Sequence, residues 1–214
     1  MCMSTKVKPK IASRSRIQQK NRSVILKAGL EVFSQYGFRG STVDQLAKAA
    51  GMSKPNLLYY FPSKEAVHVA LLEQLLKNWL EPLLELGPSD NPIEEILIYV
   101  RKKLAMSKKY PQESRLYANE ILQGAPNFIS SIKGPLKTLV DEKADLINSW
   151  VKQGKLADID PYHLLFSIWS STQHYADFDV QIKGILGSRD NNSIHDAEKH
   201  LMHMFRSMLT PPAS

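Results

Sequence analysis

Apolar residues recur at helical spacing along almost the whole chain. The first stripe consists of Ile25, Ala28, Gly29, Val32, Phe33 and Tyr36. Residues three and four apart share one face of an α-helix, so this stripe predicts an amphipathic helix that ends at Gly37. Further stripes predict helices from the cap Ser63 to the Gly87-Pro88 break and over 92–109, 112–123, 133–153, 161–180 and 193–209. No segment alternates convincingly with a period of two, and the prediction is an all-α fold of about nine helices.

Two further short helices, joined by a tight turn, are predicted within residues 41–65. Thr42 and Gln45 are spaced as a capping box for the first of them. Gly51 stands where a left-handed residue ends a helix, and Ser53 can cap the next one. Caps this close together force a sharp turn between the helices. The apolar face of the first short helix comprises Val43, Leu46, Ala47 and Ala50.

This arrangement is typical of a helix-turn-helix DNA-binding motif. Leu57 and Leu58 can anchor the second short helix inward, which leaves its start and its outer side for DNA. In such motifs, side chains at the N-terminal part of the second helix reach base edges in the major groove. The alternative is an ordinary helical hairpin in a bundle. The residues expected to contact DNA are Thr42, Lys54, Pro55, Asn56, Tyr59, Tyr60 and Lys64.

The excess positive charge of the chain lies at its N-terminus. The chain has 28 Lys and Arg residues and 21 Asp and Glu residues. Residues 1–22 contain seven of the cations and no acidic residue, so the rest of the chain carries equal numbers of both. We expect residues 1–20 to form a flexible basic arm that contacts phosphate or the minor groove.

Composition also indicates the domain organisation and the compartment. We expect a helix-turn-helix domain over 21–65 and a larger helical domain over 66–210. No run approaches the length of about 18 apolar residues that a membrane-spanning helix needs. The one cysteine, Cys2, excludes an internal disulfide, and a reducing cytoplasm is the expected location.

The predicted helix 161–180 carries polar residues inside an apolar face. Thr172 and Gln173 lie in a stripe that also contains Trp169. Polar groups that are buried in this way need hydrogen-bond partners. They are therefore candidates for contacting a small ligand.

The predicted helix 112–123 has a comparable face that contains Arg115 and Asn119. An unpaired buried guanidinium is costly. Arg115 therefore points outward, pairs with Glu120 or another acid, or contacts a ligand.

The segment FSQYGFRGSTVDQLAKAAGMSKPNLLYYFPSKEAV resembles the TetR family of bacterial repressors. The resemblance implies a three-helix DNA-binding domain joined to a larger helical domain that binds a ligand and dimerises. It places Trp79 at the ligand pocket and the homodimer interface on helices 161–180 and 193–209. Two symmetry-related recognition helices would then read successive major grooves of operator DNA, with Tyr60 and Lys64 on phosphate. The features that carry the resemblance are Tyr36-Gly37, Thr42, Gly51, and the Tyr-Phe-x-x-Lys pattern of Tyr60, Phe61 and Lys64.

The segments YPQESRLYANEILQGAP and LVDEKADLINSWVKQGKLADIDPYHLLFSIWSSTQHYADF resemble a TetR subgroup that regulates pyrimidine utilisation and responds to uracil and thymine. Chemistry fits this implication, because a carboxamide such as that of Gln173 can accept from a ring N–H and donate to the adjacent carbonyl. Arg115 can donate to a carbonyl, and Trp79 or Trp169 can cover the ring face. The chain departs from the subgroup at Ala118-Asn119, where bulkier residues are expected. The expected effector-binding set is Trp79, Arg115, Asn119, Trp169, Thr172 and Gln173.

Two other functions stay open at this point. The first is a TetR-type repressor that senses a different small planar or aromatic compound. The second is an all-helical enzyme or adaptor that uses the Ser, His and Arg groups of the C-terminal half, although Ser170, Ser171 and His174 lack the Gly-rich turn that presents a nucleophilic serine. No enzyme activity, cofactor or metal is expected, since His200 and His203 have no acid or cysteine cluster that completes a ligand set.

Overall fold

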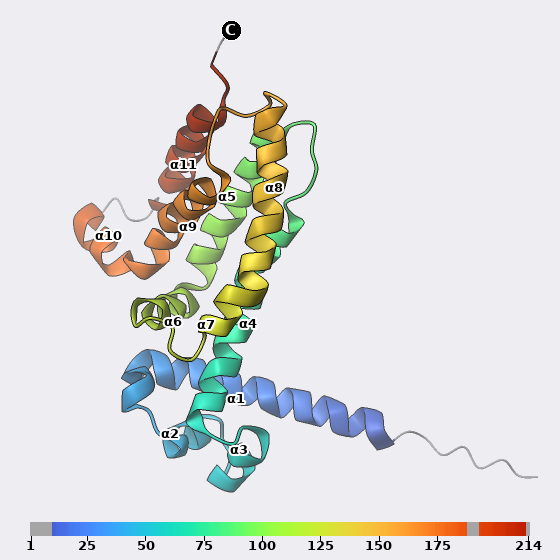
Figure 1. Ribbon diagram of the computed structural model, residues 1–214. Coiled ribbons are helices and arrows are strands. Elements are labelled where there is room, and N and C mark those ends of the chain that lie inside the picture. The colour runs from blue at the N-terminus through green and yellow to red at the C-terminus, as the bar shows by residue number, and fades with distance from the viewer. Residues whose placement is uncertain (1–9, 188–192, 213–214) are drawn as a thin grey trace, which may run out of the picture. The chain divides into compact units, whose positions relative to one another are not determined.

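The computed structural model describes residues 10–187 and 193–212 (Figure 1). Cys2 and the first part of the expected basic arm lie outside the described residues. Every regular element in the described ranges is helical, which confirms the predicted all-α class. Contacts divide the chain into two units, Met1–Leu72 and Glu73–Ser214. No helix in the described part of the chain is long and apolar enough to cross a membrane.

The first unit contains α1, α2, α3 and the start of α4. These helices span Lys10–Gly40, Val43–Ala49, Lys54–Tyr60 and Lys64–Glu85. The expected border between residues 65 and 66 falls inside α4, because the first turns of that helix pack on α1. His68 of α4 contacts the ring of Phe33 in α1 edge-on, with 4.9 Å between the ring centroids. A Cβ added to Gly29 of α1 would lie 3.1 Å from the Val67 side chain, which is tighter than most Cβ contacts, so glycine favours this close approach.

Helix α1 differs from the sequence prediction at both ends. It begins at Lys10, inside the range expected to form a flexible arm. The residues that follow Pro9 include Lys, Arg, Gln, Ile and Ala and contain neither proline nor a glycine before Gly29, so nothing in them breaks a helix. At its other end the helical backbone is interrupted at Gly37 (φ 68°, ψ 169°), where the sequence predicted the helix to stop.

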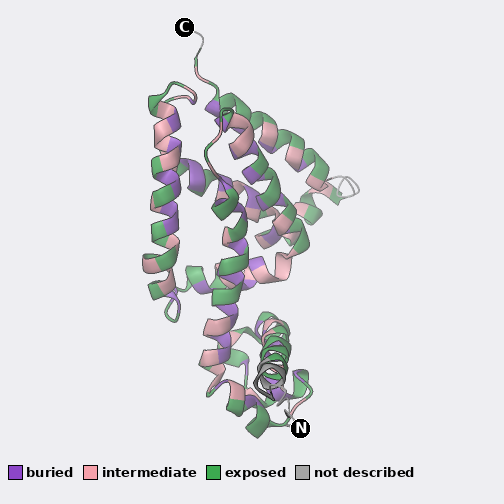
Figure 2. Cartoon of the chain, turned by 90° about the vertical axis from the view of Figure 1, so that its right-hand side faces the viewer, coloured by how far each residue is buried: buried purple, intermediate pink, exposed green. Residues whose placement is uncertain are grey.

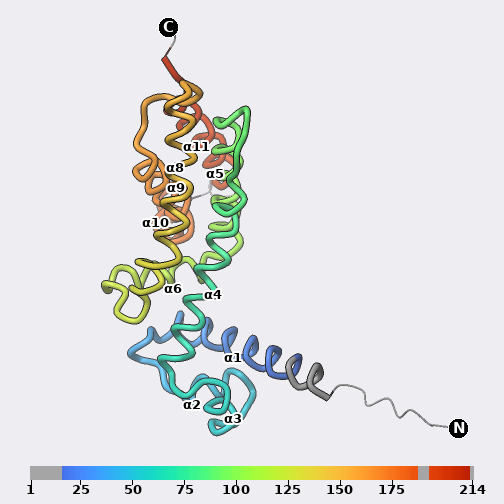
Figure 3. The backbone as a smooth tube through the Cα atoms, turned by 45° about the vertical axis from the view of Figure 1, so that its right-hand side comes forward, coloured from blue at the N-terminus to red at the C-terminus, as the bar shows by residue number. Residues whose placement is uncertain are grey.

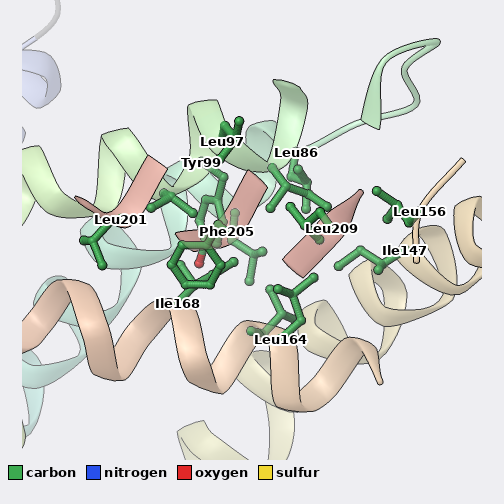
Figure 4. Close-up of a cluster of buried hydrophobic side chains, with 14 of the residues drawn as sticks. Leu86, Leu97, Tyr99, Ile147, Leu156, Leu164, Ile168, Leu201, Phe205 and Leu209 are labelled. Carbon is green, nitrogen blue, oxygen red and sulfur yellow. The ribbon is translucent and has the colours of Figure 1, made fainter. Parts of the chain in front are cut away.

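The second unit packs its helices around one apolar core. Helix α5 contacts α9 and α11, and α9 also contacts α6 and α8 (Figure 3). Buried and exposed positions alternate along these helices (Figure 2), as amphipathic helices require. Tyr99, Ile168 and Phe205 come from three different helices and meet in this core (Figure 4). The elements after α4 are α5 (Pro92–Lys109), α6 (Pro111–Leu122), α7 (Ile129–Ser131), η1 (Ile132–Leu136), α8 (Lys137–Lys152), α9 (Pro161–Asp177), α10 (Asp179–Leu186) and α11 (Ser193–Leu209).

Two predicted helices are interrupted. The helix predicted over 161–180 breaks at Phe178, whose backbone (φ −116°, ψ 27°) leaves the helical region and separates α9 from α10. The helix predicted over 133–153 begins with the π-helical turn η1, which contains Pro135. A proline has no N–H to donate, so it weakens regular α-helical hydrogen bonding at this point.

Candidate DNA-binding surface and effector site

The turn between α2 and α3 is fixed by the caps that the sequence predicts. The N–H of Gln45 donates to Thr42 Oγ1 (3.2 Å), and the N–H of Thr42 donates to Gln45 Oε1 (2.7 Å), which confirms the capping box. Gly51 adopts φ 65°, and its N–H donates to the carbonyl of Lys48. Ser53 Oγ accepts from the N–H of residue 56 at the start of α3. These local bonds define the start of α2, the turn and the start of α3.

Most of the expected DNA-contacting residues lie on the exposed side of α3. Leu57 is fully buried and anchors the helix, whereas Leu58 is 37% exposed, so the expectation that both leucines point inward was wrong for Leu58. Adjacent side chains on an α-helix point in directions about 100° apart, so Leu58 need not follow Leu57 into the core. Tyr59 is 72% exposed. The other exposed members of the expected set are Thr42, Lys54, Pro55 and Asn56.

Tyr60 and Lys64, which the sequence assigns to phosphate, are partly engaged within the protein. Tyr60 Oη accepts a hydrogen bond from the side-chain amide of Asn21 (2.7 Å), so its own proton can still be donated. Lys64 Nζ donates to the carbonyls of Phe38 and Ser41, each at 2.9 Å. An ammonium has three protons, so one remains for a phosphate oxygen. Lys64 therefore also holds together the end of α1 and the start of α2.

Exposed cations lie on α1 and α3, and one of them pairs with an acid. Arg16, Lys20 and Arg22 are exposed on α1, and the Arg22 guanidinium lies 4.1 Å from the centre of the Phe61 ring. Lys54 forms an exposed ion pair with Asp44 of α2 (2.9 Å). Contact between Lys54 and DNA would have to break this pair, whose stability in solvent is small.

The expected effector-binding residues are spread over three helices of the second unit. Trp79 of α4 is buried, Asn119 of α6 is exposed, and Gln173 of α9 is partly buried. The buried Thr172 donates its hydroxyl to the carbonyl of Ile168 (2.7 Å), one helical turn earlier. Its polar group is therefore satisfied within α9 and needs no ligand.

Arg115 meets an acid, which is one of the alternatives that the sequence left open. Its guanidinium donates to Asp179 Oδ1 (3.0 Å) and to the carbonyl of Ala176 (2.9 Å). The acid is Asp179 and not the Glu120 that its own helix offers. Arg115 thus links α6 to the junction of α9 and α10, and its contact with Ala176 satisfies a carbonyl at the end of α9.

A line of polar side chains runs between α5 and α9, which we call the α5–α9 seam. Trp169 of α9 donates its indole N–H to Tyr99 Oη of α5 (2.7 Å). Two turns further along α9, Asp177 interacts electrostatically with Lys103, which lies one turn after Tyr99. Gln173 is four residues from both Trp169 and Asp177, so it lies on the same face of α9 between these two contacts.

Burial perturbs the ionisation of both charged groups in the seam. Lys103 is 4% exposed, and burial lowers its pKa to about 7 despite the opposing attraction of Asp177. Burial raises the pKa of Asp177, while a hydrogen bond from Ser114 opposes the shift. Ser114 Oγ lies 2.6 Å from Asp177 Oδ1. Perturbed ionisable groups of this kind mark candidate functional sites, although structural networks can produce them too.

Sequence reasoning did not single out Tyr99, Lys103, Ser114 or Asp177. Lys103 carried a signal, because it falls on the apolar face of 92–109 with Ile96 and Val100. A cation at such a position must be paired, neutral or functional. Asp177 carried no such signal, since it stands near the end of a predicted helix, where an exposed acid is ordinary.

The cavities described for the second unit lie elsewhere. One, of about 450 Å³, is lined by residues of α5, α9, α10 and α11, including Tyr175, Asp179 and His195. Another, of about 500 Å³, includes Trp150 and Lys155. None of the expected effector-binding residues lines either cavity.

Comparison with known proteins gives matches over both units. The family described as bacterial regulatory proteins, tetR family, matches residues 25–71, and the YcdC-like protein C-terminal region matches residues 72–211. The HTH-type transcriptional regulator RutR of Escherichia coli K12 is 51% identical over 175 residues, which cover 82% of each chain. The regulator EthR of Mycolicibacterium smegmatis is 29% identical over 142 residues, which cover 65% of this chain and 64% of that one. Among solved structures, the regulator SCO4942 of Streptomyces coelicolor superposes with a TM-score of 0.67 at 26% identity, covering 90% of this chain and 99% of that one.

Proposed function

This chain belongs to the TetR family of bacterial regulatory proteins, and we propose that it is a repressor of pyrimidine-utilisation genes that uracil or thymine releases from DNA. Regulators of this family bind operator DNA, dimerise and bind small-molecule effectors, and they are not enzymes. The proposal adds the effector, the residues that contact it and the residues that contact DNA. We also propose that the protein acts in the cytoplasm.

The DNA-binding part of the proposal is supported by the exposure of α3. Lys54, Asn56 and Tyr59 are exposed on this helix, where they can reach base edges in the major groove. Tyr60 and Lys64 retain protons that they can donate to phosphate. The capping box holds the start of α2 and Ser53 caps α3, so a rigid motif presents these side chains to DNA.

The effector part of the proposal is carried by the α5–α9 seam. Polar groups are concentrated there between otherwise apolar helices, and Gln173 lies in the middle of them. Its carboxamide offers one donor and one acceptor side by side, as the edge of a uracil ring does. Trp79 contacts Lys103 and Trp169 contacts Tyr99, so both supply aromatic surface at the seam. Arg115 is engaged with Asp179, so in this proposal it positions α9 and α10.

Uracil must favour one conformation of the dimer if it is to release the protein from DNA. A ligand that bound the DNA-competent and released conformations equally would shift nothing. The seam joins α5 to α9, and α9 carries the proposed dimer interface. Occupation of the seam can therefore alter how two subunits are oriented.

The first experiment tests DNA binding and effector release together. Duplex sequences selected from a random pool serve as the operator in a mobility-shift titration with the full-length protein. We expect affinity to fall steeply as salt rises, because binding releases counterions from phosphate, and we expect uracil or thymine to release the complex. Release by another planar ring, but by neither pyrimidine, would contradict the effector assignment. Salt-independent or absent DNA binding would contradict the whole proposal.

Gln173→Ala tests the proposed site. We expect this variant to bind the selected duplex as the wild type does but to lose release by uracil, since the amide contacts only the effector. Gln181→Ala, an exposed residue of α10, is the matched control and should behave as the wild type. Unchanged uracil release in Gln173→Ala would rule out the proposed role of this residue.

A further inference from the structure

We propose that Lys103 and Asp177 form the polar end of the effector site and select a neutral ring that presents a carbonyl next to an N–H. The Lys103 ammonium would donate to the carbonyl, and the Asp177 carboxylate would accept from the N–H. This inference rests on the proposed function, because it assumes that an effector enters the α5–α9 seam. It adds two charged residues that neither the sequence pattern nor the family comparison assigns.

Lys103 is a buried cation whose ammonium lies against an aromatic ring. It is buried on α5, as are Val100 and Leu104 of the same helix. Its Nζ lies 4.1 Å from the centre of the Trp79 ring. Among the residues that the structure describes, this ammonium donates no hydrogen bond and forms no ion pair within 4.0 Å. A cation–π contact offsets only part of the cost of burying an ammonium.

Asp177 supplies the complementary negative charge, but it does not form a direct ion pair with Lys103 among the described residues. The hydroxyl of Ser114, which is fully buried, donates to Asp177 Oδ1 and fixes the carboxylate. A carboxylate accepts about four hydrogen bonds, so capacity remains after this one. The two charges attract each other, yet no ion pair within 4.0 Å joins them among the described residues. A donor–acceptor group placed between them would contact both.

The helical register brings this pair next to the residues already proposed for the effector. Lys103 and Tyr99 are one turn apart on α5, and Asp177 and Gln173 are one turn apart on α9. Trp169 of α9 is bonded to Tyr99, and Lys103 attracts Asp177, so α5 and α9 lie side by side along the seam. Gln173 and the Lys103–Asp177 pair can therefore contact two edges of one small ring.

The position of Lys103 also suggests how the effector is sensed. Its ammonium occupies a face of Trp79, which is where a flat ring would stack. A ring that stacks on this face takes the place of the ammonium and at the same time offers it a carbonyl oxygen. Lys103 thus exchanges a cation–π contact for a charged hydrogen bond, which is the stronger interaction.

The pair of charges defines the class of ligand. A neutral cyclic amide or imide satisfies both groups and leaves no net charge in the core. A ring whose nitrogens are methylated cannot donate to Asp177. A ring that carries a carboxylate brings a second anion towards Asp177, which costs free energy at low effective dielectric.

Calorimetric titration of the full-length protein tests the inference. We expect Lys103→Met to weaken uracil binding by at least about 10-fold, because a hydrogen bond to a charged group is lost. Lys102→Met is the matched control, since the neighbouring Lys102 is exposed and pairs with Glu85 at the surface; its affinity should equal that of the wild type. Equal affinity of Lys103→Met and wild type would overturn the inference. Binding of each variant to the selected duplex shows that it is folded.

The N–H contact is tested with a second ligand. We expect 1,3-dimethyluracil to bind the wild type at least about 10-fold more weakly than uracil, and Asp177→Asn to reduce this difference. Asp145→Asn, at an exposed position of α8, should keep it. Equal binding of the two ligands to the wild type would exclude an acceptor at this edge.

A titration with other ligands distinguishes failure of this inference from failure of the proposed function. If uracil and thymine do not bind the wild type, the pyrimidine assignment fails, and a panel of other neutral cyclic amides, including hydantoin, succinimide and 2-pyridone, is titrated. Binding of one of them that Lys103→Met weakens would support the Lys103–Asp177 site alone. Absence of binding across the panel would overturn this inference as well.

Discussion

At the scale of single residues, the second unit combines one costly group with many well-satisfied ones. Thr172 and Ser114 direct their hydroxyls to nearby acceptors, and Arg115 is paired with Asp179. Lys103 is different, because its charge is buried against an aromatic ring and lowers the free energy of unfolding. A residue that costs stability and lies beside a proposed ligand site fits a role in binding better than a role in folding.

Lys103 should make stability depend on pH above neutrality. Burial lowers the pKa of Lys103 in the folded chain to about 7, from 10.5 for an unperturbed lysine. Between these values the unfolded chain binds more protons, so the free energy of unfolding rises with pH by up to about 1.4 kcal/mol per unit. Urea unfolding at fixed protein concentration between about pH 7 and pH 9 measures this slope. Tyr99 and Tyr117, whose pKa values burial raises, oppose it only above about pH 10.

Lys103→Met should flatten this slope and raise stability near pH 7. Methionine fills similar space without charge, so the cost of burying an ammonium is removed. Lys102→Met, which removes an exposed cation from the same helix, should keep the wild-type slope. A slope that persists in Lys103→Met would assign the pH dependence to another group.

The sequence predicted the local contacts of the helix-turn-helix better than the contacts between helices of the second unit. Caps such as Thr42 and Ser53 act on amides two or three residues away, so their partners can be read from the chain. The partners of Arg115 and Asp177 are Asp179 and Ser114, and each comes from a different helix. Such pairings depend on how helices pack, which the pattern along one chain does not specify.

At the scale of elements, local chemistry decides where helices begin and end. Asp160 Oδ1 accepts from the N–H of His163 (2.9 Å), and Pro161 opens α9, as the sequence predicted. The break at Phe178 had no comparable signal, because no glycine or proline stands there. The contact from Arg115 to the carbonyl of Ala176 and its ion pair with Asp179 act on either side of this break. A tertiary contact from α6 thus accompanies a helix end that local propensity does not indicate.

Gly51→Ala should weaken the helix-turn-helix through its backbone alone. Gly51 has φ 65°, and a Cβ added there would meet no heavy atom within 4 Å. The left-handed conformation should therefore lower the free energy of unfolding by about 1 kcal/mol, with no contribution from a steric clash. Urea unfolding should show this loss, and DNA affinity should fall because the turn sets the direction of α3.

Gly184→Ala is the matched control for Gly51→Ala. Gly184 lies inside α10, has no positive φ, and likewise leaves open space for a Cβ. Alanine at this position should leave the protein unchanged or stabilise it by up to about 1 kcal/mol. Equal stability losses in the two variants would show that the left-handed backbone is not the cause.

At the scale of the whole molecule, the positive charge lies near the DNA-binding motif, whereas exposed apolar side chains lie on the helices proposed for dimerisation. The net positive charge comes from the first 22 residues, so attraction to DNA is concentrated next to the helix-turn-helix. The second unit instead exposes apolar side chains on the two helices proposed for dimerisation. Tyr162 and Phe166 of α9 are one turn apart, and Met204 and Met208 of α11 are also one turn apart. Each pair therefore lies on one face of its helix, and we predict that the two faces form a self-complementary surface for a twofold partner.

Phe166→Glu should convert the protein into a monomer that binds operator DNA poorly. Phe166 is 49% exposed on α9, and a carboxylate at the centre of the proposed interface would be buried against its symmetry mate. Two recognition helices must span half-sites about 34 Å apart, and loss of the second contact should reduce affinity by about 100-fold or more. Light scattering after size exclusion gives the mass, and a mobility-shift titration gives the affinity. Leu122→Glu places the same charge at an apolar residue of α6 that is 83% exposed, and it should stay dimeric and bind DNA normally. A dimeric Phe166→Glu protein with full operator affinity would move the interface away from α9.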